Sequence, residues 1–399
     1  MRAMILAAGK STRLWPLTID RAKPAIPFMG RPLVGYVAEY LARHGCTEVL
    51  VNLHHRPESV RGALGDGSAF GVRLRYVEEP EILGTSGALD NARALLEDET
   101  FVVVNGKIAT DINLDAALET HRRTGALATL VLRPNPARER YSTVITRDGL
   151  IRGFGPMPQP PETSQPSDAS DNAGSAARAS QNSANLHSPN PPATAAGETT
   201  GNAKASDGGK ATDDRQAGKD SIGETDTGGN SVGVPDDDAD VPLMFTGIHI
   251  IEPRIFEYIP RGVFSDSAID VYPKAIERGE PIAAHVAAGM WYELSTVKRY
   301  LDTSLALMRR EGRDVETCAG ATIQTGAEVS DAVLWENVTV ERGARVRRAV
   351  LGADVRARAG VTWENVAVVR AQLARVSERP EKGLRGEFDG ENFVAPLPG

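Results

Sequence analysis

The chain has 399 residues, a formal net charge of −8 and only two cysteines. This length exceeds the usual size of one domain, roughly 100 to 200 residues, so we expect two or more folded units. The acidic balance leaves no basic face for nucleic acid, which we exclude as a partner. Two cysteines form neither a metal-binding pair nor a disulfide framework. This suits a reducing compartment, so we expect a cytoplasmic location. The apolar run at residues 4–8 is too short for a membrane span or a signal segment.

The first 154 residues alternate apolar runs with helical segments. Runs at residues 3–6, 48–51 and 101–104 are typical of buried strands, and residues 33–44 are typical of a helix. Continuous apolar runs suit strands that are covered by helices on both faces. The alternation therefore predicts a parallel α/β sheet.

A polar tract interrupts this pattern. Between Phe154 and Phe245 there is no aromatic Phe, Tyr or Trp, and we predict disorder for residues 156–240, because they cannot bury enough apolar surface to order. The flanks at residues 143–146, 150–154 and 243–251 are typical of strands, so we interpret the tract as an insertion within one domain. The alternative is a linker, which would leave residues 241–310 to fold separately, near the lower limit for a core.

A repeat follows a predicted helix at residues 298–310. Apolar residues recur six apart (Ile323 and Val329, Val340 and Val346, Val355 and Val361) and seventeen apart (Val329 and Val346, Val333 and Val350, Val338 and Val355). This period is close to one three-sided coil of hexapeptide repeats, and it predicts about three β-helix coils in residues 311–370, followed by a tail at 371–399. The alternative is a few edge strands of an ordinary sheet. In a β-helix Trp335 and Trp363 could stack a ligand, but we interpret them as packing or interface residues.

The strongest motif follows the first strand, at residues 6–18, with Lys23-Pro24 soon after it. Gly9 lets the backbone approach a phosphate, whose charge Arg13 and Lys23 can balance. The alternative is a tight turn with solvated basic side chains, and the spacing of Arg13 and Lys23-Pro24 argues against it.

These residues resemble the signature of the sugar-1-phosphate nucleotidyltransferases, Leu-Ala-Ala-Gly-x-Gly-Thr-Arg-Leu-x-Pro-Leu-Thr followed by a lysine and a proline. The mannose-1-phosphate guanylyltransferase branch is also similar at residues 54–57, 64–68, 83–89 and 245–248. The resemblance implies a Rossmann-like nucleotidyltransferase domain with a mixed sheet over residues 1–310, and then a short left-handed β-helix.

The resemblance also implies transfer of a nucleotidyl group from an NTP to a sugar 1-phosphate, most closely GTP and mannose 1-phosphate, with Mg²⁺ as cofactor. It implies catalytic roles for Arg13 and Lys23 and sugar-side roles for Thr246, Gly247 and Glu293, of which Glu293 would also hold the metal. The implied nucleotide-binding residues are Leu6, Ala7, Ala8, Gly9, Lys10, Ser11, Thr12, Gly84, Thr85, Ser86, Gly87, Asn105 and Lys107. A homo-oligomer, or a hetero-oligomer with a paralogous subunit, is expected.

The chain departs from this family pattern at several positions. Lys107 stands where the family places a metal-binding Asp, and an ammonium group cannot coordinate Mg²⁺. Glu293 replaces the second expected Asp, whereas we interpret Asp111 as structural. Ser11 replaces the second loop glycine and so loses the freedom to take positive φ.

Two hypotheses follow from these departures. On the first, Lys107 replaces part of the metal's charge and the chain remains a transferase. On the second, the chain binds a nucleotide or nucleotide sugar without turnover and regulates a partner.

The lysine that the family places after Phe154 is also missing, since Gly155-Pro156-Met157 stands there.

Overall fold

The computed structural model describes residues 1–156 and 241–398, which belong to one compact unit. The tract predicted to be disordered, 156–240, lies outside these described residues except for Pro156. Among the helices of the two described ranges, none combines the length and the apolarity that crossing a bilayer requires.

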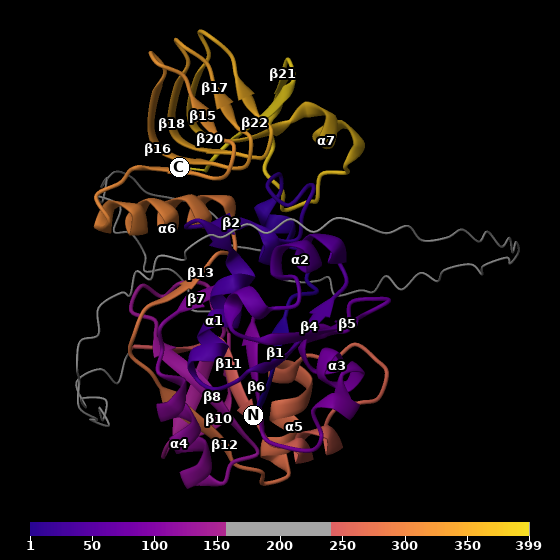
Figure 1. The fold of residues 1–399 in the computed structure, drawn as a ribbon. Helices are drawn as coiled ribbons and strands as arrows, with labels where there is room; N and C mark the ends of the chain where they lie inside the picture. The colour runs from indigo at the N-terminus through magenta and orange to yellow at the C-terminus, as the bar shows by residue number, and fades with distance from the viewer. Residues whose placement is uncertain (157–240, 399) are drawn as a thin grey trace, which may run out of the picture. The chain divides into compact units, whose positions relative to one another are not determined.

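A nine-stranded mixed sheet forms the centre of the fold (Figure 1). Its strands β5, β4, β1 and β6 are parallel, as predicted for the first 154 residues, and β11 runs antiparallel to both of its neighbours, β6 and β8. Across the sheet the strands follow the order β5 (Arg73–Glu78), β4 (Glu48–Leu53), β1 (Arg2–Leu6), β6 (Phe101–Asn105), β11 (Leu243–Ile251), β8 (Ala128–Pro134), β12 (Ile282–Val286), β10 (Leu150–Gly155) and β9 (Thr143–Arg147).

Helices cover both faces of this sheet. The apolar side chains of β1 divide between the two faces, with Ala3 and Ile5 in one core and Met4 in the other, and all three are fully buried. This explains the continuous apolar runs in the sequence. The first core contains α1 (Leu33–Arg43), α2 (Pro57–Leu64) and α4 (Leu114–Thr124), and the second contains α3 (Gly84–Asn91) and α5 (Tyr272–Glu277).

The strands on either side of the undescribed tract lie in the same sheet. β9 and β10, which precede the tract, pair with each other, and β11, which follows it, pairs with β9 through Leu243 opposite Val144. Two short ribbons, β2 (Pro27–Phe28) with β3 (Arg31–Pro32) and β7 (Ile108–Thr110) with β13 (Trp291–Glu293), complete the strands of this part.

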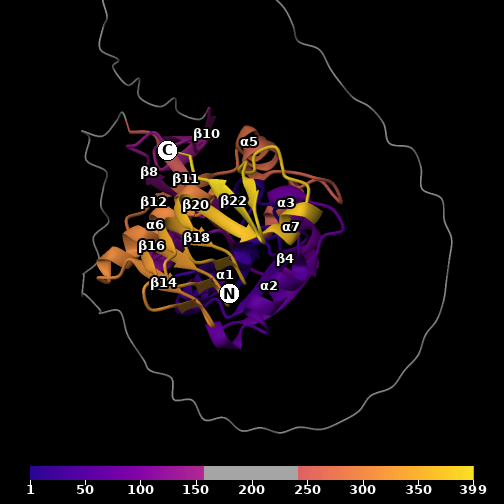
Figure 2. The same cartoon turned by 90° about the horizontal axis from the view of Figure 1, so that it is seen from above.

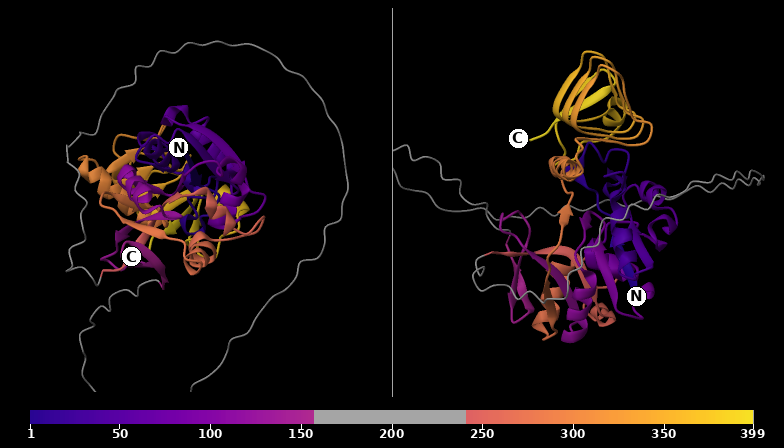
Figure 3. Two further views of the ribbon diagram at one scale, coloured as in Figure 1. Left: turned by 90° about the horizontal axis from the view of Figure 1, so that it is seen from below. Right: turned by 60° about the vertical axis from the view of Figure 1, so that its left-hand side comes forward.

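Stacked coils of 17 residues follow α6 (Val297–Arg310). Val329 pairs with Val346, and Val333 with Val350, in parallel register, which confirms these two predicted neighbours. The right-hand view of Figure 3 shows three-sided coils, and a positive φ recurs every 17 residues at Asp331, Arg348 and Asn365. The coil strands are β14 (Val315–Thr317), β15 (Thr322–Ile323), β16 (Glu328–Leu334), β17 (Thr339–Val340), β18 (Arg345–Leu351), β19 (Arg356–Ala357) and β20 (Thr362–Arg370).

Residues 371–398, predicted only as a tail, instead cover the last coil. They form α7 (Ala371–Val376), β21 (Glu387–Asp389) and β22 (Asn392–Pro396), and β22 pairs antiparallel with β20. Figure 2 shows β22 beside β20. Without this hairpin the last coil would present an open strand edge.

A shared apolar core joins the coils to the segment that follows β1. Leu14 and Trp15 of that segment pack with Trp335 and Phe393, and the rings of Trp15 and Phe393 lie 5.3 Å apart. Trp335 is 1% exposed and its Nε1 donates to the Tyr300 hydroxyl at 3.0 Å. Trp335 therefore packs inside this chain, as does Trp363, which is buried in the core of the coils.

Candidate active site

A pocket of about 390 Å³ opens at the carboxyl ends of β1 and β6, where Leu6 lies opposite Asn105. In open parallel sheets, ligands bind at the carboxyl ends of two neighbouring strands whose chain connections run to opposite sides of the sheet. β1, which lies between β4 and β6, is at such a point. The pocket is lined by Leu6, Ala7, Ala8, Gly9, Ser11, Thr12, Arg13, Lys23, Pro24, Asn52, Glu79, Ile82, Gly84, Thr85, Asn105, Gly106, Lys107, Asp266 and Ser295.

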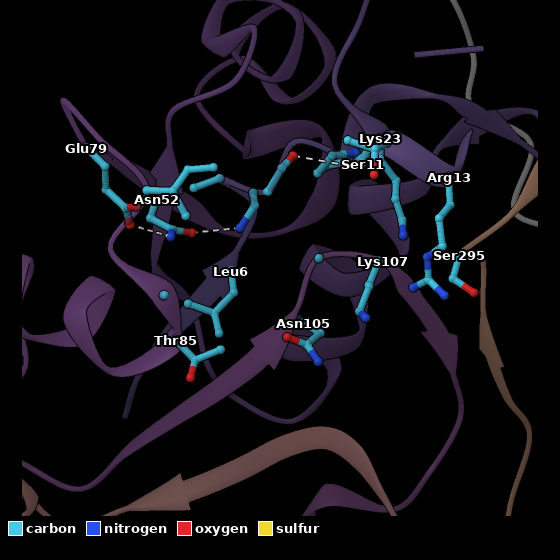
Figure 4. A pocket seen from close by; sticks show the side chains of 18 of the residues that line it. Leu6, Ser11, Arg13, Lys23, Asn52, Glu79, Thr85, Asn105, Lys107 and Ser295 are labelled. Carbon is cyan, nitrogen blue, oxygen red and sulfur yellow. Dashed lines mark hydrogen bonds between the residues drawn. The ribbon is translucent and has the colours of Figure 1, made fainter. Parts of the chain in front are cut away.

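The loop after β1 is anchored by a buried relay of hydrogen bonds (Figure 4). The Ala7 amide donates to Asn52 Oδ1 at 2.6 Å, and Asn52 Nδ2 donates to Glu79 Oε1 at 2.6 Å. Glu79 Oε2 in turn accepts from the Leu83 amide at 3.1 Å, and burial raises the pKa of the Glu79 carboxyl. The relay therefore links the loop to the residue that precedes α3.

The first turn of α3 forms a second wall. Gly84 has φ +75°, and a Cβ there would lie 2.5 Å from the Ser265 carbonyl oxygen, so only glycine fits. That carbonyl accepts from the Ser86 amide at 3.0 Å and from the Gly87 amide at 3.3 Å. These two amides therefore hold the loop that contains Ser265, while Gly84 and Thr85 face the pocket.

Three cationic side chains line the other end of the pocket. Figure 4 shows Arg13, Lys23 and Lys107 directed into the same region. Lys23 is only 6% exposed, and its burial, together with the charges of Lys107 and Arg13, lowers its pKa to about 7. Clustered positive charge in a partly closed pocket is suited to a polyphosphate.

Lys107 forms an ion pair with Glu293 beneath the pocket. The Lys107 ammonium donates to Glu293 Oε1 at 2.5 Å, and the Tyr141 hydroxyl donates to Oε2 at 3.2 Å. Burial alone would raise the pKa of Glu293, but Lys107 and Lys23 lower it to about 2. Arg299 donates to the Tyr141 hydroxyl and to Glu139, which closes the network behind Glu293.

These residues do not suit a bound Mg²⁺. Lys107 offers donors only, and both oxygens of Glu293 already accept hydrogen bonds. Within residues 1–156 and 241–398, no cluster of three or more His, Cys, Asp or Glu side chains could hold a metal ion. Asp111, interpreted as structural, accepts from the Met290 amide at 2.5 Å.

The structure gathers most of the predicted site residues around one pocket. Twelve of them line it: Leu6, Ala7, Ala8, Gly9, Ser11, Thr12, Arg13, Lys23, Gly84, Thr85, Asn105 and Lys107. Lys10 is exposed outside the lining, and Ser86 and Gly87 lie behind it. Thr246 donates to the Val131 carbonyl at 2.7 Å, Gly247 packs against Asn105, and Glu293 reaches the pocket only through Lys107.

Sequence reasoning missed Asn52, Glu79, Ile82, Asp266 and Ser295, which also line the pocket. Asn52 had a usable signal, because it follows an apolar run predicted as a strand parallel to the first one. Asp266 had none, since it reaches the pocket through a loop that packs on α3. Its Oδ2 accepts from Thr85 Oγ1 at 3.3 Å.

Comparison with known proteins agrees with this geometry. A family model described as nucleotidyl transferase matches residues 2–171. The matched segment is less than half of the chain, and it is similar to nucleotidyl transferases. Its relatives include sugar-1-phosphate nucleotidyltransferases that differ in base and sugar.

Three such relatives illustrate the range of bases and sugars. A UTP–glucose-1-phosphate uridylyltransferase of Synechocystis is 26% identical, over 86% of this chain and 72% of that protein. An N-acetylmuramate alpha-1-phosphate uridylyltransferase of Neisseria meningitidis is 43% identical, over 30% of this chain and 52% of that protein. A mannose-1-phosphate guanylyltransferase of Mycobacterium tuberculosis is 33% identical, over 39% of this chain and 40% of that protein.

The fold is also found among solved structures. HddC of Yersinia pseudotuberculosis superposes with a TM-score of 0.51 and 16% identity, covering 77% of this chain and 99% of that one. This likeness establishes the Rossmann-like α/β fold of the nucleotidyltransferases.

Proposed function

We propose that the chain transfers a nucleotidyl group from a nucleoside triphosphate to a sugar 1-phosphate. The observation that carries this proposal is the convergence of Arg13, Lys23 and Lys107 on a glycine loop at the end of β1. A phosphate oxygen of the sugar 1-phosphate attacks the α-phosphorus, the bond from that phosphorus to the β-phosphate oxygen breaks, and pyrophosphate leaves. Arg13 and Lys23 stabilise the charge that develops on the departing pyrophosphate.

GTP and mannose 1-phosphate are the proposed substrate pair. The support is similarity to guanylyltransferases at residues 54–57, 64–68, 83–89 and 245–248. Relatives that use UTP make uridine nucleotides the first alternative.

A second candidate function is nucleotide binding without turnover, in a subunit that regulates a partner. The specific observation in its favour is the ion pair between Lys107 and Glu293, which engages the side chain expected to hold the metal. Both candidates use the same pocket and differ only in whether pyrophosphate is released.

The test is pyrophosphate release by the purified protein with four NTPs and a panel of sugar 1-phosphates. We expect turnover with one pair, and a loss of about a hundredfold in kcat/KM for Arg13→Gln, because a charge-assisted contact to the reacting phosphates is removed. Arg43→Gln changes an exposed arginine at the end of α1 and serves as the matched control. Nucleotide binding without turnover favours the regulatory subunit, and the absence of both binding and turnover contradicts both candidates.

Three further features belong to this proposal. We infer left-handed winding for the 17-residue coils, on the basis of the hexapeptide spacing. Association with a second copy or a paralogous subunit is proposed by analogy with the Drosophila relative named as a catalytic subunit beta. A cytoplasmic location suits Cys46 and Cys318, both of which are free thiols.

A further inference from the structure

We propose that the ammonium group of Lys107, held by Glu293, takes the place of a protein-bound divalent cation, and that the pocket binds nucleoside triphosphates in their metal-free form. The inference rests on the proposed function, because it concerns the same pocket, and it specifies the chemical form of the ligand.

The ammonium group of Lys107 has a fixed position. Lys107 lies in the turn between β6 and β7, and its carbonyl accepts from the Leu294 amide at 3.2 Å. The preceding Gly106 amide donates to the Leu6 carbonyl at 2.9 Å. Glu293 lies on β13, whose pairing with β7 sets Glu293 opposite Ile108. The backbones on both sides of the ion pair are therefore held by hydrogen bonds.

The side chain of Lys107 is nevertheless open to a ligand. It is 36% exposed and lines the pocket, whereas the Glu293 side chain is 6% exposed and lies behind it. Within residues 1–156 and 241–398, the ammonium group donates only the short bond to Glu293 Oε1, which uses one of its three hydrogens. The remaining two are available to phosphate oxygens.

The carboxylates around the pocket already accept hydrogen bonds from the protein. Glu293 accepts from Lys107 and Tyr141, as described above. Glu79 accepts from Asn52 and from the Leu83 amide. A hard cation such as Mg²⁺ needs oxygen ligands that are free to turn toward it.

Asp266, the other carboxylate in the lining, is also engaged. Its Oδ1 accepts from the Ala268 amide at 2.9 Å and its Oδ2 from Thr85 at 3.3 Å. Coordination of a metal by Asp266 would compete with these two hydrogen bonds, the first of which caps the π-helical segment Ser267–Val271. Each carboxylate of the described lining therefore already accepts hydrogen bonds.

Charge balance also favours a metal-free nucleotide. Arg13 and Lys107, joined by Lys23 when a bound polyphosphate restores its charge, face the carboxylate of Glu293 at this end of the pocket. Magnesium removes two units of negative charge from a nucleoside triphosphate, so the metal-free nucleotide is the better electrostatic partner for this cluster. A tethered ammonium also needs no ion from solution.

The test is isothermal titration of the full chain with GTP, ATP, UTP and dTTP, each in EDTA and in excess Mg²⁺. We expect at least one nucleotide to bind the unmodified chain in EDTA with a Kd within about twofold of its value in Mg²⁺, or tighter. Lys107→Asp should lose at least about tenfold in EDTA, equivalent to one charge-assisted contact, and recover with Mg²⁺.

Two further variants make the result specific. Lys107→Met should lose a similar factor in EDTA without recovery in Mg²⁺, because it supplies neither a cation nor a metal ligand. Lys274→Asp makes the same charge reversal at an exposed position on α5 and should leave both constants unchanged. Circular dichroism of each variant establishes that it is folded before titration.

The outcomes separate the inference from the proposed function. Binding by the unmodified chain that requires Mg²⁺ overturns the inference and leaves the proposed function intact. Equal loss for Lys107→Asp in EDTA and in Mg²⁺ also overturns it, since the aspartate would then not restore a metal site. No binding of any nucleotide in either buffer overturns the proposed function itself.

Discussion

Lys23 is a buried amine whose protonation responds to its neighbours. Burial first, and then the positive charges of Lys107 and Arg13, lower its pKa from 10.5 to about 7, although the negative charge of Glu293 partly opposes this shift. A bound polyphosphate would supply negative charge at short range and raise the pKa again. Nucleotide binding should therefore be coupled to proton uptake by Lys23.

We predict that nucleotide affinity falls as the pH rises from 7.5 to 9, by at most about tenfold per pH unit, because one proton is taken up. In the free pocket Lys23 is mostly neutral above pH 7, and binding must restore its charge. Titration calorimetry in two buffers with different ionisation enthalpies measures the proton uptake. Lys23→Met should bind more weakly, with a flat pH profile; the same slope in this variant would assign the proton to another group.

Ser11 has a left-handed backbone conformation, with φ 55° and ψ 36°, although it carries a Cβ. The prediction that serine would not take positive φ here is wrong, because the backbone keeps the glycine-like conformation at a steric cost of about 1 kcal/mol. The loop is held in this shape by its surroundings, among them the bond from Ala7 to Asn52.

We predict that Ser11→Gly raises the free energy of unfolding by about 0.5 kcal/mol, because the relief of the left-handed strain slightly exceeds the added backbone entropy of the unfolded chain. Urea unfolding measures the change. Ser11→Ala removes the same hydroxyl but keeps the Cβ, so it should not be stabilising. Equal stability of the alanine and glycine variants would refute the strain argument.

Among the residues of the site, those joined by local spacing could be predicted from the sequence. Gly9, Arg13 and Lys23 lie within one short segment, so their convergence needs only a strand followed by a loop. The contact of Lys107 with Glu293 could not be predicted, because 186 positions separate them and the β7–β13 pairing brings them together. The sequence alone shows that Lys107 and Glu293 each replace an expected aspartate. Only the fold shows that the two side chains form an ion pair.

At the scale of elements, strands with continuous apolar runs were the most predictable. β1, β4 and β6 lie where their sequences indicated, since helices cover both of their faces. The direction of β11 could not be read from its composition, because an apolar run looks the same in either orientation. Its antiparallel pairing with β6 and β8 is what makes the sheet mixed.

The coils provide a matched pair of tryptophans for testing how two elements are coupled. Trp335 packs with Leu14 and Trp15, beside the loop that carries Arg13, and the Arg21 guanidinium lies 4.8 Å from its ring. Trp363 is also buried, but its neighbours belong to the coils themselves. Trp335 therefore contacts the loop and, through Tyr300, α6, whereas Trp363 contacts neither.

We predict that Trp335→Ala and Trp363→Ala each lower the free energy of unfolding by about 3–5 kcal/mol, since each leaves a large cavity. Only Trp335→Ala should also increase hydrogen exchange in residues 12–25 and weaken nucleotide binding. Exchange measured by mass spectrometry under native conditions distinguishes the two variants. Equal protection of residues 12–25 in both would mean that the coils do not support the loop.

At the scale of the whole molecule, the sequence predicted a domain boundary at residue 310. Among the described residues, one apolar core contains side chains from both sides of that boundary. Tyr300, Leu301 and Leu305 of α6 pack with side chains from the loop after β1 and from the coils. Sequence periodicity identifies a repeat but not the surfaces that the repeat covers. For this reason residues 371–398 also appeared to be a tail, whereas β22 pairs with β20.

We predict that the full chain unfolds in urea as one cooperative transition, because the shared core cannot be disrupted on one side only. Circular dichroism and tryptophan fluorescence should give the same midpoint, and Trp335→Ala should shift both together. Two separated transitions, one for the sheet and one for the coils, would contradict this expectation.

The contact between Trp15 and Phe393 has a consequence for how the protein is made. Trp15 precedes Phe393 by 378 positions, so it is synthesised long before its packing partner. At about 5–20 residues per second, the segment behind the pocket waits roughly 20 to 80 s for its packing partner. During that interval Leu14 and Trp15 are apolar side chains without their final cover, so we expect this segment of the nascent chain to bind a chaperone.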